Sequence, residues 1–193
     1  MKSAIPAVIV GANMKTYTKT GDNGKTSVNG LKRLPKSEII FDTLGTLDEL
    51  NTSLGFLHTI RNKKIKSIIV DVQMDLLSIG SIVSEKKVEL DLEKKVLALE
   101  ETLDIYEQKL PELKSFIIPG GSKFSVSFHT SRVVCRRLER KLVEYENSTS
   151  KDIGVILTYV NRLSDLLFVL ARYVNFKLGI KELLWKTKRT RNT

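Results

Sequence analysis

The sequence predicts an all-α protein, an up-and-down bundle of five helices. Apolar residues recur every three or four positions over five long stretches between Ser37 and Lys177, which places them on one face of each helix. Short polar or Pro-Gly segments separate these stretches, and only four prolines interrupt 193 residues. Hydrophobic residues make up 41% and charged residues 28%, so one well-buried domain is expected.

The first residues are expected to lie outside this domain. They carry no charge after Lys2 and hold a short apolar run, which lacks the arginines of a mitochondrial presequence and makes a poor secretory signal. We therefore predict a disordered extension there, with a weak targeting segment as the alternative. The predicted boundaries are an extension at 1–14, a domain at 15–185 made of a loop at 15–36 and a bundle at 37–185, and a basic tail at 186–193.

Residues 15–36 show neither a helical nor a strand period, and we predict a loop. Hydroxyl side chains, glycine amides and lysines dominate it, and these are the donors that grip phosphate groups. A P-loop is excluded, because Lys19 stands where that motif needs its first glycine, five positions before Gly24. A solvated arm is the alternative.

Helical spacing places the first three helices at Ser37–Arg61, Ile65–Ser84 and Asp91–Lys109. The second and third show an apolar face and no chemistry. The first carries a second stripe of Asp48, Asn51, Thr52 and Gly55, whose small residues leave room for something to approach. Asp48 either forms a solvated acidic pair with Glu49 or meets an arginine from another helix.

A connector at Pro111–Pro119 leads into the fourth helix, predicted from about Ser122 to Tyr145. Within the connector, Phe116 and two isoleucines precede a Pro-Gly-Gly breaker. An apolar ring at such a place usually plugs a helix end. An aromatic lid over a ligand is the alternative.

The fourth helix has two contrasting faces. His129, Arg132, Arg136 and Arg140 fall on one stripe, and Cys135 lies among leucines and valines roughly opposite. A row of guanidinium groups repels itself unless something anionic lies against it. The stripe therefore predicts an anion site, and Cys135 is expected to belong to the core.

The fifth helix, predicted at Asp152–Lys177, carries a polar row beside its apolar face. A solvated face would not contain a phenylalanine, so this row is expected to be half buried, against the fourth helix or a neighbouring subunit. Arg162 and Asp165 are three positions apart and can form a local ion pair. The row consists of Asn161, Ser164, Asp165, Phe168 and Arg172.

Composition narrows the class of ligand. The formal charge of +10 suits nucleic acid, acidic lipid or a polyphosphate, but no aromatic residues alternate with the basic ones, so no nucleic-acid role is expected. No apolar run of membrane-spanning length is recognised. Neither His58 nor His129 has metal-binding neighbours, and the one cysteine excludes a multi-cysteine site, so no protein-bound metal is expected. No Ser-His-Asp arrangement for nucleophilic catalysis is recognised either. Between bundle helices, these residues would bind a nucleotide or similar anion.

Five motifs together resemble the PduO-type ATP:corrinoid adenosyltransferases, in that family's order and spacing, over about residues 15–185. The resemblance implies a homotrimer of five-helix bundles with active sites between subunits. The implied reaction transfers the 5′-deoxyadenosyl group of ATP to the cobalt of cob(I)alamin, giving adenosylcobalamin and triphosphate. The motifs are Tyr17-Thr-Lys-Thr-Gly-Asp-Asn-Gly24, Gly45-Thr-Leu-Asp-Glu-Leu-Asn51, Phe116-Ile-Ile-Pro-Gly-Gly121, Cys135-Arg-Arg-Leu-Glu-Arg140 and Asn161-Arg-Leu-Ser-Asp165.

The resemblance also implies which residues hold ATP. Any Mg²⁺ would ride on the phosphate oxygens rather than on a protein cluster. Arg136 would both bind ATP and act in catalysis. The implied ATP-binding residues are Thr18, Lys19, Thr20, Gly21, Thr26, Ser27, Lys36, Arg136, Arg137, Glu139, Arg140 and Asn161.

Three further catalytic positions are implied. Asp48 would pair with Arg132 across the subunit boundary, and Phe116 would occupy the lower axial face of cobalt. Exclusion of an axial donor there would ease the reduction of Co(II) to the Co(I) nucleophile. Leu138 and Ile118 depart from the family's usual alanine and leucine, but both stay apolar.

A non-catalytic ATP- or corrinoid-binding regulator or chaperone with the same bundle is the alternative function. The expected partners are ATP, a reduced corrinoid, further copies of this chain, a flavin-dependent reductase and an enzyme that uses adenosylcobalamin. The expected compartment is the cytoplasm, or the mitochondrion if the source is eukaryotic.

Overall fold

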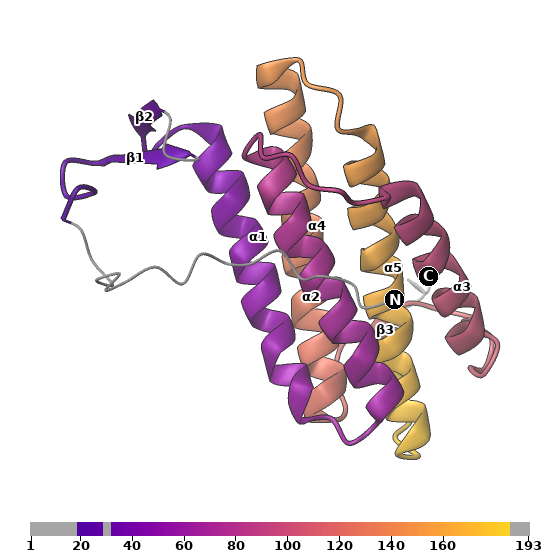
Figure 1. The fold of residues 1–193 in the computed structure, drawn as a ribbon. Helices are drawn as coiled ribbons and strands as arrows, with labels where there is room; N and C mark the ends of the chain where they lie inside the picture. Colours follow the sequence, from indigo (N-terminus) through magenta and orange to yellow (C-terminus); the bar gives the residue numbers. More distant parts are fainter. Residues whose placement is uncertain (1–18, 29–31, 186–193) are drawn as a thin grey trace, which may run out of the picture. The chain divides into compact units, whose positions relative to one another are not determined.

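The computed structural model describes residues 19–28 and 32–185 (Figure 1). The chain divides into two compact units, Met1–Lys36 and Ser37–Thr193. This division falls where the sequence predicts the loop to end and the bundle to begin.

The first unit contains a β-hairpin, where the sequence predicted a loop without regular structure. β1 (Lys25–Val28) and β2 (Lys32–Pro35) pair in antiparallel register. The amide of Lys36 donates to the carbonyl of Gly24 at 2.8 Å and extends the pairing by one step. The prediction was wrong because strands of four residues are too short for an alternating pattern to be recognised.

The described part of the second unit contains five α-helices, which confirms the predicted helix number. A 3-10 helix, η1 (Phe56–Thr59), follows the first of them, so that helix ends earlier than the predicted Arg61. The fourth helix continues past the predicted Tyr145. The helices are α1 (Ile39–Gly55), α2 (Lys63–Val83), α3 (Leu92–Glu107), α4 (Lys123–Thr149) and α5 (Gly154–Lys177).

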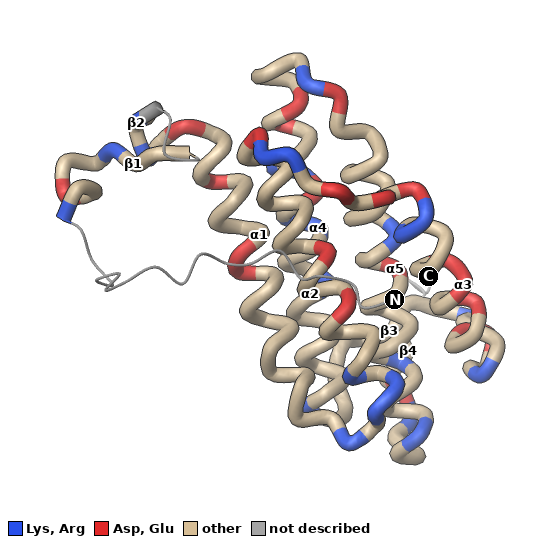
Figure 2. Tube along the Cα trace, in the orientation of Figure 1, with Lys and Arg blue, Asp and Glu red and all other residues tan. Residues whose placement is uncertain are grey.

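The five helices lie side by side and bury their apolar faces against one another. α4 packs against both α1 and α5, α2 packs against α1, and α3 packs against α5. Charged residues of both signs follow the outer side of α3 (Figure 2). The core is made of leucines and other apolar residues from all five helices, among them Leu50, Leu76, Leu99, Leu138 and Leu167.

Side-chain caps fix where α2, α3 and α4 begin. Asn62 accepts hydrogen bonds from two amides in the first turn of α2, and Asp91 accepts one from Lys94 at 3.0 Å in α3. Ser122 accepts from the amide of Ser125 at 3.1 Å at the start of α4. These caps satisfy amides that have no partner within the helix.

α5 is the most buried of the helices. By length and composition it could cross a membrane, which the sequence analysis did not recognise. More than half of that apolar stretch is buried inside the bundle. Leu163, Leu166 and Leu170 are fully covered, so packing as a core helix accounts for the composition.

A buried polar network connects α2, α3 and α5. Asp75 of α2 is only 6% exposed. Its Oδ2 accepts a hydrogen bond from the Tyr159 hydroxyl of α5 at 3.0 Å, and its Oδ1 lies 2.7 Å from the Lys95 ammonium of α3. Burial, and next the Asp75 charge, raise the pKa of Tyr159, so its hydroxyl stays protonated and remains a donor.

Asp75→Asn is expected to lower the free energy of unfolding by about 1–3 kcal/mol, because Lys95 loses its charged partner and Tyr159 donates to a weaker acceptor. Urea unfolding followed by circular dichroism measures the change. Asp71→Asn, one turn earlier on the exposed side of α2, is the control and should change stability by less than about 0.5 kcal/mol. Equal effects of the two substitutions would contradict the role assigned to the network.

Candidate active site

α4 displays the two faces that the sequence predicts. Cys135 and Leu138 are fully buried, whereas Arg136 and Arg140 are exposed. The Cys135 thiol donates to the carbonyl of Val160 at 3.3 Å, and burial raises the pKa of this thiol. Cys135 is therefore a core residue, as expected, and its packing leaves Arg136 and Arg140 at the surface.

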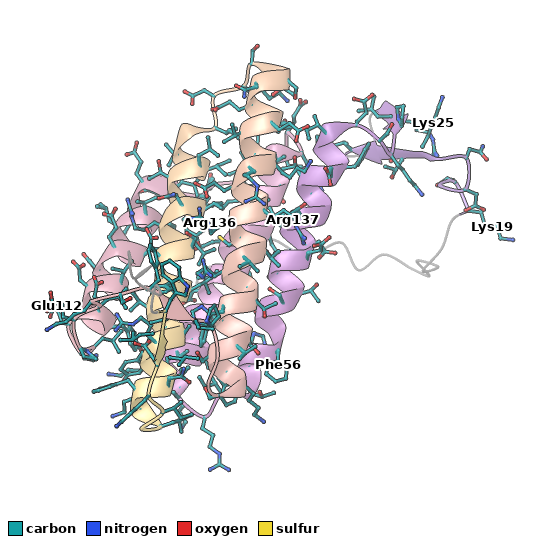
Figure 3. The ribbon with its side chains drawn as sticks, turned by 180° about the vertical axis from the view of Figure 1, so that it is seen from behind. Lys19, Lys25, Phe56, Glu112, Arg136 and Arg137 are labelled. Atoms are coloured by element: carbon teal, nitrogen blue, oxygen red, sulfur yellow. The ribbon has the colours of Figure 1, made fainter. Side chains whose placement is uncertain are left out.

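Two residues of the basic motif on α4 have partners on the neighbouring helices. Arg137 forms an ion pair with Glu49 of α1 (Figure 3). Glu139 accepts a hydrogen bond from the Asn161 amide of α5 at 2.9 Å. The structure thus joins two of the predicted ATP-binding residues, Glu139 and Asn161, and turns Arg137 toward α1.

Arg136 and Arg140 are two exposed cations of α4. Arg140 donates from Nη1 to the backbone carbonyl of Arg136 at 2.9 Å. Neither guanidinium group forms an ion pair with any carboxylate of the described chain. Two such groups, one helical turn apart, suit the negative charge spread over a chain of phosphates.

Arg132 lies one turn nearer the start of α4 and is half buried. Its guanidinium carbon lies 6.0 Å from the centre of the Phe168 ring, and its buried Nε has no hydrogen-bond partner among the described residues. Burial, and next the positive charge of Arg136, lower the pKa of Arg132. Asp48 is exposed on α1 and forms no ion pair within residues 37–185. The pairing of Asp48 with Arg132 across two chains therefore stays a prediction.

His129 was placed on the stripe by the sequence but received no role. The side chain is 5% exposed, its ring lies 6.0 Å from that of Phe168, and its Nδ1 has no partner in the described structure. Burial, and next the Arg132 charge, lower the pKa of His129 to about 4. The imidazole is therefore neutral at neutral pH. Its spacing of three from Arg132 was legible in the sequence, but its burial was not.

The predicted polar row of α5 is half buried, as expected. Ser164 and Arg172 are buried, Phe168 is partly covered, and the other members are exposed. The expected local ion pair is present, because Arg162 lies 3.1 Å from Asp165. A second carboxylate, Glu100 of α3, lies 2.9 Å from Arg162.

Phe116 does not plug a helix end, so that interpretation was wrong. Its side chain is 77% exposed, and its ring meets the ring of Trp185 edge-on with centres 6.3 Å apart. The next two residues form β3 (Ile117–Ile118), which pairs in antiparallel register with β4 (Leu183–Leu184). An exposed ring on a short strand is compatible with the alternative interpretation, a lid.

The Pro-Gly-Gly turn between β3 and α4 is held by one side chain of α5. This side chain, Asn175, is buried. Its Oδ1 accepts a hydrogen bond from the amide of Ser122 at 2.9 Å. Its Nδ2 donates to the carbonyl of Gly120 at 2.9 Å and to the hydroxyl of Ser125 at 3.0 Å. Gly121 adopts φ +95° and packs directly on this amide. The backbone of the turn that follows Phe116 is therefore held in place by α5.

A cavity of about 160 Å³ lies behind this turn. Gly121 and Asn175 line it on one side, and His129 and Glu182 line it on another. The cavity therefore connects the base of the Phe116 segment with the buried end of the stripe on α4.

The predicted ATP-binding loop residues lie in the first unit. Thr26 and Ser27 belong to β1, and Lys36 follows β2. The Lys36 ammonium group lies close to the backbone of Gly21, since a Cβ at Gly21 would be 3.4 Å from it. Lys19 and Thr20 precede this hairpin, and Thr18 lies outside the described residues.

No group of three or more His, Cys, Asp or Glu side chains that could hold a metal ion occurs in residues 19–28 and 32–185. A Mg²⁺ ion at this site would need phosphate oxygens and water as most of its ligands.

Fold and site together define a helical-bundle protein with an exposed pair of arginines, Arg136 and Arg140, on one helix. The cobalamin adenosyltransferase family model matches residues 16–174. The corrinoid adenosyltransferase MMAB of Mus musculus is 38% identical, over 89% of this chain and 77% of its own length. A corrinoid adenosyltransferase of Bacillus subtilis is also 38% identical, over 86% of this chain and 90% of its own.

Solved structures agree with these relatives. A phenylalanine-to-alanine variant of a PduO-type ATP:corrinoid adenosyltransferase from Lactobacillus reuteri, complexed with cobalamin and ATP, superposes with a TM-score of 0.84 at 29% identity. The match covers 90% of this chain and 100% of that one. The chain belongs to the cobalamin adenosyltransferase family. The resemblance to the PduO type and the expected enzyme class, a transferase, are confirmed.

Gly121→Ala is expected to destabilise the fold by about 2 kcal/mol or more, because φ +95° strains a residue with a Cβ and that Cβ would lie within 2.8 Å of three Asn175 side-chain atoms. Gly120→Ala is the matched control, since a Cβ there meets only a carbonyl at 3.9 Å. Thermal unfolding of both variants measures the difference. A Gly121→Ala protein as stable as Gly120→Ala would contradict the close packing of this turn.

The stability of the protein should fall on acidification in part because of His129. The imidazole titrates at 6.5 in its ordinary state but only at about 4 in the fold, so the unfolded chain binds more protons between these pH values. Up to about 3 kcal/mol should therefore be lost as the pH falls from about 6.5 to about 4. Unfolding free energies across this range, for wild type and His129→Gln, should show a shallower slope for the variant. Parallel slopes would contradict the assignment.

Proposed function

We propose that this chain transfers the 5′-deoxyadenosyl group of ATP to the cobalt of cob(I)alamin, giving adenosylcobalamin and triphosphate. Family membership establishes the class of reaction, ATP-dependent adenosyl transfer to a corrinoid. The observation that carries the residue assignment is the stripe on α4. Its exposed guanidinium groups, Arg136 and Arg140, lie on the same helix that begins at the Phe116 turn.

ATP is held by two sets of residues in this proposal. The helical set is Arg136, Arg137, Glu139, Arg140 and Asn161. Arg136 and Arg140 face the phosphates, while the hydrogen-bonded pair of Glu139 and Asn161 offers an acceptor and a donor to the nucleoside. The loop set adds lysines, hydroxyl groups and a glycine amide, with Mg²⁺ on the phosphate oxygens. The loop set is Thr18, Lys19, Thr20, Gly21, Thr26, Ser27 and Lys36.

In the chemical step, the electron pair of Co(I) forms a bond to the 5′ carbon of ATP while the bond from that carbon to the triphosphate oxygen breaks. Triphosphate leaves with the electron pair of the broken bond. Negative charge therefore grows on the leaving group, and cations that bind ATP stabilise the transition state more strongly than the ground state. Arg136 is assigned this catalytic role.

Phe116 is proposed to cover the lower axial face of cobalt. Its exposure supports this, since a ring that is 77% exposed on a short strand is free to meet a ligand. An apolar ring excludes water and other axial donors from the metal. Four-coordinate Co(II) is then easier to reduce to the Co(I) nucleophile. Two solved relatives that hold cobalamin and ATP are variants in which a phenylalanine is replaced.

The active assembly is proposed to be a homotrimer with sites between subunits. A buried guanidinium nitrogen without a partner is costly, and Arg132 has one within the described chain. Asp48 is exposed on α1 and unpaired in the same part of the chain. A second copy that brings Asp48 to Arg132 would satisfy both groups and help to shape the corrin pocket.

Other parts of the assignment stay predictions. A flavin-dependent reductase would supply the electron for Co(I), and an enzyme that uses adenosylcobalamin would receive the product. The cytoplasm, or the mitochondrion in a eukaryote, stays the predicted compartment.

The test of the proposed function is direct. Pure protein incubated with ATP, Mg²⁺ and chemically reduced cobalamin should shift the corrin absorption spectrum to that of the adenosyl form and release triphosphate. A non-catalytic regulator with the same bundle, the alternative, would bind ATP without releasing triphosphate. An unchanged spectrum with Co(I) present would refute the transferase proposal.

Arg136→Ala should lower kcat by about 100- to 1,000-fold, because one charge that stabilises the leaving triphosphate is removed. Its unfolding temperature should stay near that of wild type, since the side chain is exposed. Arg61→Ala, an exposed arginine between α1 and α2, is the control and should keep wild-type turnover. Wild-type kcat in Arg136→Ala would remove this residue from the catalytic assignment.

A further inference from the structure

A buried ion pair anchors the segment that follows α5. Arg172 of α5 is 4% exposed, and its Nε donates to both carboxylate oxygens of Glu182, at 3.0 and 3.2 Å. Its Nη2 donates to the carbonyl of Pro111 in the connector before β3, at 3.0 Å. One buried guanidinium group therefore holds two segments, residues 111–116 and 180–185, at the same place.

The segment anchored by Glu182 holds Phe116 in turn. β4 pairs with β3 so that Leu184 lies opposite Ile117. The amide of Trp185 donates to the carbonyl of Phe116 at 2.7 Å. The Ser115 hydroxyl donates to the carbonyl of Trp185 at 3.0 Å. The backbone on both sides of the Phe116 ring is therefore fixed by residues 183–185.

Beyond these backbone contacts, the side chains of this segment bury little surface. Leu183 is 65% exposed and Trp185 is 51% exposed. A cavity of about 490 Å³, lined by Pro111, Arg172, Glu182 and Leu184 among others, lies beside it. A pairing of two residues on each strand is too short to persist alone in water. The ion pair is thus the main anchor of β4.

We infer that Arg172 and Glu182 are positioning residues for the cobalt-facing ring, acting on Phe116 through β4 and Trp185. This inference rests on the proposed function. If the pair is broken, β4 detaches, the Phe116 segment loses the support of β4 and Trp185 although Asn175 still holds the turn that follows it, and water can reach the lower face of cobalt. The chemistry then slows although neither residue touches a substrate.

A positioning role of the Arg172–Glu182 pair can be distinguished from a merely stabilising role by the effect of breaking the pair. Loss of an ordinary pair lowers the unfolding temperature and leaves the site intact. Loss of a positioning pair moves β4 in a protein that is still folded. The chain offers a direct reporter of this movement, because Trp185 at the end of β4 is its single tryptophan.

The first test measures the tryptophan fluorescence of the full chain without substrates. Glu182→Ala should shift the emission to longer wavelength and increase acrylamide quenching, while far-ultraviolet circular dichroism stays unchanged. Glu85→Ala is the matched control, because it removes an exposed ion pair with Lys151, beyond the far end of α4. A Glu182→Ala spectrum identical to wild type would overturn the inference, whatever the activity.

The second test asks whether the movement reaches cobalt. With cob(II)alamin and ATP, wild type is expected to show the electron paramagnetic resonance signal of four-coordinate Co(II), and Glu182→Ala should lose it. Its kcat should fall by about 10- to 100-fold, with the KM for ATP unchanged. Glu85→Ala should match wild type in both. A full four-coordinate signal in Glu182→Ala would overturn the inference.

Two further outcomes are distinguishable. If wild type itself forms no adenosylcobalamin, the proposed function fails, and the fluorescence test still decides whether the pair holds β4.

If Glu182→Ala does not fold because Arg172 is left unpaired, Leu183→Pro serves instead, since it disrupts β4 but leaves the ion pair in place. Leu183→Pro should lose the four-coordinate signal as well, and its retention would contradict the link from β4 to Phe116.

Discussion

The basic side chains on α4 repel one another unless negative charge lies against them, and the neighbouring helices supply part of that compensation. The buried face, with Cys135 at its centre, fixes which way the row points. α1 supplies a carboxylate to Arg137, and α5 supplies a hydrogen-bonded amide to Glu139. Arg136 and Arg140 are left without carboxylate partners in the described bundle, which is the reason they are proposed to bind a polyanion.

α5 connects the two ends of the proposed site. In its first half, Asn161 donates to Glu139, in the part of α4 that is proposed to face ATP. Three to four turns further on, Arg172 and Asn175 hold the segments on either side of Phe116. Because α5 is also the most buried helix, the distance between these two ends is set by a rigid element. The corrin side and the nucleotide side of the site thus share one scaffold.

The sequence predicts much of the fold, because the helices depend on local apolar spacing that each stretch shows by itself. It fails where structure depends on distant partners: β3 has two residues and pairs with β4, 65 positions later in the register Ile118–Leu183. For the site, the stripe on α4 and the motif residues could be identified from the sequence alone. The burial of His129, the grip of Asn175 on the turn and the Arg172–Glu182 pair were not, since each depends on which helices meet.

The buried thiol on α4 has a consequence for cobalt chemistry. A thiolate is a soft, strong ligand for transition metals, and only the deprotonated form binds them well. The single cysteine of the chain lies on the same helix as the proposed catalytic arginine, yet it is fully covered, donates to the Val160 carbonyl and has a raised pKa. The chain therefore carries no accessible thiol of its own that could coordinate the metal or compete with Co(I) for the 5′ carbon.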